Sequence, residues 1–213
     1  MLITKQLKRP LAVAALALSF CTVSAEAAQI LDIMTAPLYV RGTWANFGFS
    51  FSVSELVRVD ALGLYDVGAN GFADEHPVGL WNDTGDMLAQ VIIDNSSTAS
   101  ASVNANHAWR FTDIEPIILA PGTYKMGAFY PTTADAFAGS SAENPANILF
   151  SPVITFGSSY VTTGGTEFFT EPNTTTGFNP GFFGPNARFT VVPEPATLTC
   201  LALGGLMLIR RRR

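Results

Sequence analysis

Cysteine is almost missing from this chain of 213 residues. Its two cysteines, Cys21 and Cys200, lie near the two ends, so the long stretch between the end segments contains none. A disulfide framework, a cysteine-based zinc site and thiol catalysis are therefore excluded in that stretch. With about 165 residues, the central stretch is still large enough to fold on a hydrophobic core alone.

Long apolar runs are also missing. The first apolar run, Leu11–Phe20, has about ten residues, whereas a membrane-spanning helix needs about 20. A basic segment (residues 5–9) precedes it and small residues follow it, which is the order of a secretory signal peptide. We therefore expect residues 1–27, with a short signal helix, to direct export through the secretion translocon. Signal peptidase is expected to cleave after Ala25 or Ala27.

Basic residues are scarce once both ends are set aside. Seven of the 12 Lys and Arg residues lie in the end segments, which leaves 12 − 7 = 5 for residues 28–192. Two of the 17 Asp and Glu residues lie there, which leaves 17 − 2 = 15. The central part thus carries a formal charge of 5 − 15 = −10. Such a surface repels phosphate backbones, so we expect no nucleic-acid partner.

The C-terminus combines three features in series: a Val-Pro-Glu-Pro motif, an apolar stretch and a cluster of arginines. These are Val192, Pro193, Glu194 and Pro195, then Ala196–Ile209, then Arg210, Arg211, Arg212 and Arg213. As a helix the apolar stretch would be roughly 21 Å long, which is short of the roughly 30 Å of a bilayer core. By the positive-inside rule the arginines stay in the cytoplasm as a membrane stop, and the rest of the chain lies outside.

This tail resembles the PEP-CTERM sorting signal that exosortases recognise. The resemblance covers residues 192–213 and implies recognition through Glu194 and cleavage near Pro-Glu-Pro by an exosortase-like membrane protease. It also implies transient anchoring at the inner membrane, followed by transfer to the cell surface or the extracellular matrix. Such proteins typically occur in bacteria that make exopolysaccharide, flocs or biofilms. A plain tail anchor is the alternative.

Residues 28–191 show short alternating runs separated by Gly, Pro, Asn and Asp, and no helical period of useful length. Phe47, Phe49 and Phe51, for example, alternate with small residues, as in a strand with one apolar face. About ten such runs predict an all-β domain, an antiparallel two-sheet sandwich that is jelly-roll-like. The predicted strands are Phe47–Val53, Val57–Tyr65, Val78–Trp81, Met87–Ile93, Trp109–Phe111, Ile117–Leu119, Tyr124–Tyr130, Asn147–Phe150, Val153–Phe156, Tyr160–Thr162 and Arg188–Val192. Residues 163–187 are expected to form a packed loop.

A second resemblance concerns residues 47–130. Gly79-Leu80-Trp81, Gly85, Leu88-Ala89 and Ala120–Tyr124 occur in the order of an uncharacterised β-sandwich module of secreted bacterial proteins. This resemblance implies a fold and no activity.

The chain offers few residues for catalysis or metal binding. His76 and His107 form no His-x-x-x-His pair, and we expect both to be loop histidines without a catalytic role. The densest group of oxygen ligands is Asp66, Asn70, Asp74 and Glu75. Its spacing lacks the Asp-x-Asp-x-Asp repeat of a calcium loop, so a turn between strands is the favoured interpretation and calcium the weaker one. No other cofactor is expected.

Aromatic side chains are plentiful and could stack on sugars. We expect Trp81 and Trp109 to belong to the core, whereas Trp44 lies ahead of the first strand and is a weak candidate for ligand binding. The sequence therefore predicts a non-enzymatic surface or matrix protein that is associated with exopolysaccharide. The alternative is a secreted or periplasmic glycan hydrolase, although no pair of carboxylates is singled out.

Overall fold

A computed structural model describes residues 27–35, 38–40, 45–140, 147–163, 171–172, 174–175 and 181–193. Over these ranges the chain is all-β, and all strand pairs within its sheets are antiparallel. The fold class predicted from the alternating runs is confirmed at this level. The two terminal helices expected from the sequence lie outside the described residues.

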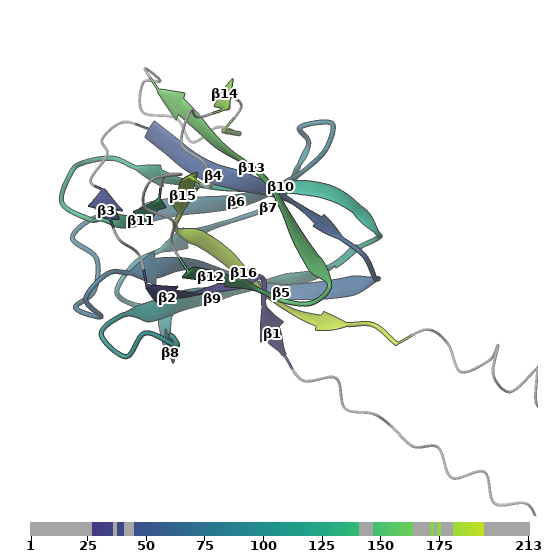
Figure 1. The fold of residues 1–213 in the computed structure, drawn as a ribbon, viewed down its shortest axis with the longest axis horizontal. Coiled ribbons are helices and arrows are strands. Elements are labelled where there is room, and N and C mark those ends of the chain that lie inside the picture. The colour runs from purple at the N-terminus through teal and green to yellow at the C-terminus, as the bar shows by residue number, and fades with distance from the viewer. Residues whose placement is uncertain are drawn as a thin grey trace, which may run out of the picture.

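Two larger sheets make up most of the structure, and Figure 1 shows them as two layers. The five-stranded sheet has the order β1 (Ala28–Gln29), β16 (Pro185–Val191), β5 (Val57–Asp66), β9 (Ala108–Leu119) and β8 (Thr98–Ala101). The six-stranded sheet has the order β14 (Thr174–Thr175), β13 (Ile154–Thr163), β4 (Ala45–Val53), β10 (Gly122–Tyr130), β6 (His76–Asn82) and β7 (Met87–Ile93). Two small sheets complete it: β15 (Gly181–Phe183), β11 (Phe137–Ser140) and β3 (Leu38–Val40), and β12 (Asn147–Phe150) with β2 (Leu31–Thr35).

The hydrophobic core lies between the two large sheets and contains side chains from both of them. In β4, Phe47, Phe49 and Phe51 point into the core, and β10 adds Met126 and Tyr130 through the same two-residue period. The five-stranded sheet meets them with residues such as Leu62 and Leu64. Burial of one such large apolar side chain stabilises the fold by about 1.5–3 kcal/mol, so this shared core dominates stability.

The strand predictions agree best where a short run is bounded by turn residues. β7 and β12 have the predicted bounds. The two runs predicted around Trp109 and Ile117 belong to the single strand β9, which is irregular near Pro116 because three residues of β9 lie opposite one residue of β5. The runs on either side of Gly157 likewise form β13, with a bulge between Phe156 and Ser159. In the sequence each irregularity looks like a strand end, because a bulge interrupts the alternation of side chains.

Some elements were not predicted at all. The strands missed by the sequence analysis are β1, β2, β3, β8, β11, β14 and β15. The predicted loop over residues 163–187 is wrong in its described parts, because β15 lies within it and β16 begins at Pro185 rather than Arg188. These strands are short, and most of them pair with strands distant in the sequence, so local alternation gives no signal for them.

Both ends of the folded part meet at one edge of the five-stranded sheet. β1 pairs with β16, and Ala28 lies opposite Phe189. The amide of Val192 donates a hydrogen bond to the carbonyl oxygen of Leu56 at 2.8 Å, and Pro193 is exposed. The strand that ends the domain therefore runs directly into the Val-Pro-Glu-Pro motif.

Candidate functional site

Two loops meet at one end of the molecule and enclose the only polar cluster that the sequence analysis had singled out. The first loop connects β5 to β6 and has positive φ angles at Gly68 (92°), Ala69 (52°) and Gly71 (88°). The second connects β10 to β11 and contains Asp135. The Gly-Ala-Asn-Gly sequence allows the first loop to turn sharply, because glycine adopts such angles without strain.

Asp66 ties the first loop to the five-stranded sheet. It ends β5, is 1% exposed, and accepts hydrogen bonds from the Gly71 amide at 2.9 Å and 3.2 Å. The Nε of Arg110 on β9 donates to its Oδ2 at 2.7 Å. The carboxylate is thus fully occupied by one cation and one backbone donor, and its charge is matched.

Asp135 joins the two loops. Its oxygens accept hydrogen bonds from the amides of Ala73 (2.9 and 3.0 Å) and Asp74 (3.0 Å). Its Oδ2 also lies 3.0 Å from Nε2 of His76, the first residue of β6, whose side chain is fully buried. Nδ1 of the same ring lies 2.9 Å from the carbonyl oxygen of Phe129.

The His76 ring therefore faces an oxygen acceptor at each nitrogen. A neutral imidazole carries only one N–H, so the contact with the Phe129 carbonyl takes that proton and the contact with Asp135 needs another. The pair is enclosed by Phe72 and Tyr130, whose ring centroids lie 5.1 and 4.8 Å from that of His76. This arrangement holds the loops in place, and it keeps His76 away from solvent and from any substrate.

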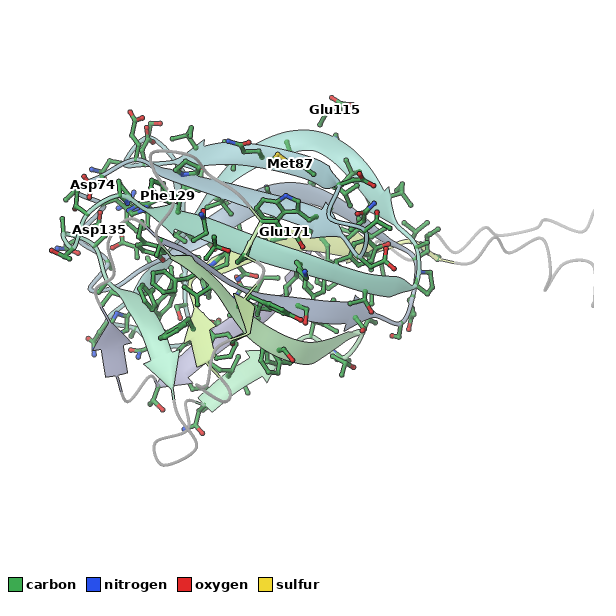
Figure 2. The ribbon with its side chains drawn as sticks, turned by 90° about the horizontal axis from the view of Figure 1, so that it is seen from above. Asp74, Met87, Glu115, Phe129, Asp135 and Glu171 are labelled. Carbon is green, nitrogen blue, oxygen red and sulfur yellow. The ribbon has the colours of Figure 1, made fainter. Side chains whose placement is uncertain are left out.

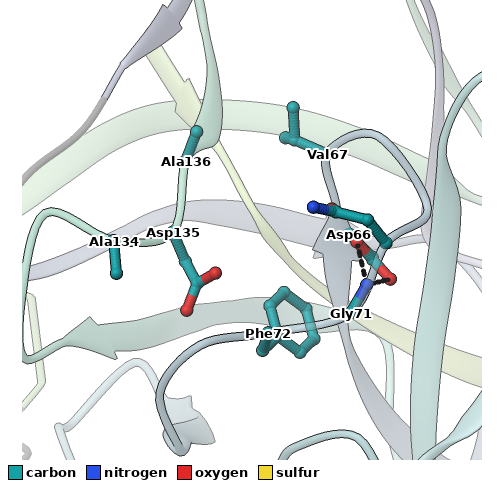
Figure 3. A pocket seen from close by; sticks show the side chains of 8 residues that line it. Asp66, Val67, Gly71, Phe72, Ala134, Asp135 and Ala136 are labelled. Atoms are coloured by element: carbon teal, nitrogen blue, oxygen red, sulfur yellow. Dashed lines mark hydrogen bonds between the residues drawn. The ribbon is translucent and has the colours of Figure 1, made fainter.

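The cavity between the loops is small and polar. Its volume is about 60 Å³, and Figure 3 shows Asp66 and Asp135 on opposite sides of it. It is lined by Asp66, Val67, Asn70, Gly71, Phe72, Ala134, Asp135 and Ala136. It can hold a few water molecules but is too small for a sugar unit. Donors already contact both carboxylates: Arg110 and the Gly71 amide contact Asp66, and His76 and the amides of Ala73 and Asp74 contact Asp135.

The weak metal prediction gains no support from this geometry. Asp66 and Asn70 line the cavity, whereas the Asp74 carboxylate accepts a hydrogen bond from the Thr132 hydroxyl and Glu75 is exposed. In the described part of the chain, no group of three or more His, Cys, Asp or Glu residues could hold a metal ion. The turn interpretation agrees with the positive φ angles of this loop.

His107 supports the same loop from the other side. Its Nδ1 accepts a hydrogen bond from the Gly68 amide at 2.8 Å, and its ring packs against Tyr65 with 5.4 Å between centroids. Partial burial lowers the pKa of His107, against the opposing effect of the nearby Asp66 charge. A neutral ring with a lone pair on Nδ1 is what the Gly68 contact requires, so its function is structural.

The two tryptophans predicted to be in the core have different surroundings. Trp109 is fully buried in the core, and its indole N–H donates to Asp32 Oδ1 of β2 at 3.0 Å. Trp81 is also buried, at 2% exposed, as predicted, but it lies on the outward face of the six-stranded sheet, opposite Lys125, and outside the main apolar cluster. Trp44 lies outside the described residues.

Several buried polar residues were missed by the sequence analysis. Asn186 is fully buried and bonds both the amide (3.3 Å) and the carbonyl (2.8 Å) of Leu31 through its side chain. Asp32 accepts hydrogen bonds from Trp109, Ser102 and the amide of Val103. Asp135 was not singled out either. A buried histidine implies an acceptor partner, so the position of His76 was the one available signal.

A more open depression of about 300 Å³ lies beside β1 on the five-stranded sheet. It is lined by Ala27, Ala28, Gln29, Ser100, Ala101, Phe111 and Arg188. Arg188 pairs with Asp60 (3.2 Å) and Asp113 (2.6 Å), and its guanidinium lies 5.7 Å from the Phe111 ring centroid. Phe111 is only 3% exposed, so its ring face is not available for stacking on a sugar.

Of the sorting motif, the structure describes Val192 and Pro193, while Glu194, Pro195 and Arg210 to Arg213 lie outside the described residues. Within the ranges that are described, no helix is long and apolar enough to cross a bilayer. No protein-family model matches the chain, and no curated protein matches it either.

Proposed function

We propose that this chain is an exported protein without catalytic activity, sorted by an exosortase-like enzyme to the cell surface or extracellular matrix. The observation that carries the proposal is the tail, in which Val-Pro-Glu-Pro, a short apolar stretch and four arginines follow one another. In this scheme residues 1–27 are removed by signal peptidase, residues 28–191 form the delivered domain, and residues 192–213 serve as the PEP-CTERM-like signal.

The end of the fold supports this proposal. The last described strand, β16, ends at Val191, and the hydrogen bond from Val192 to Leu56 lies at the start of the motif. Cleavage near Pro-Glu-Pro would therefore leave the hydrogen-bonded domain intact. Since β1 pairs with β16, the signal peptide and the tail both leave from one edge of the domain, so the unprocessed chain can meet one membrane with both ends.

For the delivered domain we propose a jelly-roll-like sandwich with a structural role, associated with exopolysaccharide in biofilms or flocs. The single shared core and the two antiparallel sheets support this architecture. A non-catalytic role is supported by the loop-end cluster, in which Asp66 and Asp135 are occupied by Arg110 and His76. The alternative, a glycan hydrolase, needs two carboxyl groups that flank a sugar in a cleft.

Mass spectrometry of the mature protein tests the sorting step. We expect the protein from its own host to end near Pro-Glu-Pro and to lack the arginines, and Glu194→Ala to retain them at the inner membrane. Glu115→Ala is a matched control, because it removes an exposed carboxylate elsewhere and should still be cleaved. Intact arginines on the wild-type surface protein would rule the proposal out.

Two assays on the host polysaccharide test the role of the domain. Retention of the protein on the polysaccharide without new reducing ends supports a matrix role, whereas release of reducing sugar supports the hydrolase. If neither retention nor release is seen, the association with exopolysaccharide is wrong while the sorting proposal still stands.

A further inference from the structure

The outward face of the six-stranded sheet contains a row of glycines. Gly127 of β10 lies opposite Gly79 of β6 on one side and Gly48 of β4 on the other. All three point outward, because their neighbours in each strand belong to the core. The sheet therefore has a strip without side chains across three adjacent strands.

Large side chains stand on either side of this strip. Trp81 and Phe129 also point outward, yet they are only 2% and 6% exposed, and both lie outside the main apolar cluster between the sheets. The dipeptide Glu171–Pro172 lies beside Trp81, since Pro172 and the indole both border Gly127, and Figure 2 shows Glu171 over the middle of this sheet. The chain thus places one of its own Glu-Pro pairs on this face.

Pro172 occupies the glycine strip. A Cβ atom on Gly127 would lie 2.8 Å from Cγ and Cδ of Pro172, and 3.4 Å from Cζ3 of Trp81. A proline ring beside an indole is the contact by which aromatic grooves recognise proline. Glycine at position 127 is therefore what allows the ring to reach the sheet.

Glu171 is held at both its side chain and its backbone. Its Oε1 lies 2.5 Å from Nζ of Lys125, and its carbonyl oxygen accepts a hydrogen bond from the Thr162 hydroxyl at 3.2 Å. The Tyr160 ring supports the ammonium group at 4.8 Å from its centroid. Carboxylate, carbonyl and proline ring are thus each bound by a different group on the sheet.

These contacts use only groups that any Glu-Pro pair possesses, and the pair occurs twice more, at Glu115–Pro116 within β9 and at Glu194–Pro195 in the tail. We propose that this face is a Glu-Pro binding site, and that Glu194–Pro195 from the tail of a second copy occupies it in exchange for Glu171–Pro172. The proposal concerns the tail before cleavage and adds an association between copies to the proposed sorting pathway. It rests on the proposed function, in which the uncleaved tail is present at the inner membrane.

We assign the ligand to a second copy. Val192, the first residue of the motif, is bonded to Leu56 beside the five-stranded sheet. Lys125 lies on the outward face of the other sheet, so the chain's own tail would have to cross from one sheet to the far face of the other. A tail from a second copy approaches that face directly.

Charge and competition set the strength of this association. The domain is acidic overall, and displacement of Glu171 frees Lys125 to attract an incoming carboxylate. The chain's own dipeptide competes at the effective concentration of a tethered ligand, which is on the order of millimolar. Exchange is therefore favoured where copies are crowded, as at a membrane.

A tail-to-face contact is not self-complementary, so it can extend into open chains of molecules.

Binding of a labelled peptide to the full chain in detergent tests the proposal. The peptide covers residues 190–197 and contains Val-Pro-Glu-Pro. We expect Glu171→Ala/Pro172→Ala, which vacates the site, to bind it at least about tenfold more tightly than wild type does, because the tethered competitor is gone. Addition of Lys125→Ala to this variant, or Glu194→Gln in the peptide, should reverse the gain.

Circular dichroism confirms that each variant is folded before binding is compared. If the double variant does not fold, Glu171→Gln weakens the chain's own dipeptide more gently and should give a smaller gain in the same direction. Equal binding of the native and Glu194→Gln peptides to a folded, vacated site would overturn the proposal, as would no gain over wild type. Because the assay involves no processing, this failure is distinguishable from a failure of sorting.

Discussion

The protein buries one tryptophan from each large sheet and covers the two in different ways. Trp109 of the five-stranded sheet is fully buried beneath β2, and its indole N–H is bound by Asp32, which also accepts three other hydrogen bonds. Trp81 of the six-stranded sheet is covered in part by Glu171–Pro172, whose ion pair with Lys125 is about one-fifth exposed. A cover that completes the hydrogen bonds of the core belongs to the fold. A cover held by a partly exposed ion pair and a proline ring can be exchanged.

The largest expected effect is at Asp32. Asp32→Ala leaves the indole N–H and the amides of Ile33 and Val103 without their acceptor, which should lower the free energy of unfolding by about 2–4 kcal/mol. Asp32→Asn keeps one acceptor oxygen and should lose less. Thermal melts of the two variants check this. A loss for Asp32→Ala no larger than that for Lys125→Ala would remove the distinction between the two covers.

Gly127→Ala should act on the other cover. The added methyl group would overlap Pro172, so the dipeptide must lift, while the core side of β10 is unchanged. We expect a loss of about 1 kcal/mol or less, together with exposure of Trp81. Fluorine NMR of 5-fluorotryptophan-labelled protein should show one of three resonances shifting, the one that Trp81→Phe removes. Gly122→Ala is a matched control, since a Cβ there has its nearest neighbours at 3.8 Å. A Trp109 shift would contradict the assignment of covers.

Lys125→Ala should have a smaller effect on stability. The ion pair with Glu171 is partly exposed, so its loss should cost less than about 1 kcal/mol, and the difference from wild type should shrink in high salt. Melts at low and high salt measure this. A loss above 2 kcal/mol would mean that the dipeptide Glu171–Pro172 is an integral part of the fold.

Mild acid should weaken the loop that His107 holds, next to Tyr65. Burial lowers the pKa of His107, so the folded protein resists protonation that the unfolded chain accepts. The contribution of His107 is therefore complete above its unfolded pKa of about 6.5 and is lost as the pH falls below it. The difference in melting temperature between wild type and His107→Gln should shrink from pH 7.5 to pH 5. A constant difference would show that the ring does not titrate in this way.

A chelator should have the smallest effect. Asp66 is already bound by Arg110 and the Gly71 amide, and Asp74 by Thr132. We therefore expect EDTA to leave the melting temperature unchanged, and added calcium to leave it unchanged as well. A shift of several degrees with chelator would restore the calcium interpretation of this loop.

The strands that could be predicted are those whose alternation is local. The Phe47–Val53 run and the Met87–Ile93 run are visible in the sequence because every second residue faces the core. Trp81 shows the limit of that logic. It alternates correctly with Leu80, but its neighbours on the outward face come from residues 171–172, about 90 positions later. Periodicity identifies two faces of a strand but does not tell which of them will be covered.

The residues of the loop-end cluster were predictable only in part. Asp66 and Asn70 were singled out as oxygen ligands close together in the sequence, while the role of Asp66 as a loop anchor depends on Arg110 of a distant strand. His76 and Asp135 are 59 residues apart, and Asn186 and Leu31 are 155 apart. No spacing rule covers such pairs, because they form when strands distant in sequence become neighbours.

The amino-acid sequence by itself determined the two terminal segments, the acidic and cysteine-free domain, and the all-β class, since charge, hydrophobic length and side-chain alternation are properties of consecutive residues. Only the tertiary structure decided which carboxylates lie beside basic side chains and which groups cover each buried tryptophan. It also decided that a Glu-Pro pair lies on a strip of glycines. These depend on long-range contacts, where a polar group is stabilised by whichever partner the packing of the sheets brings within hydrogen-bond distance.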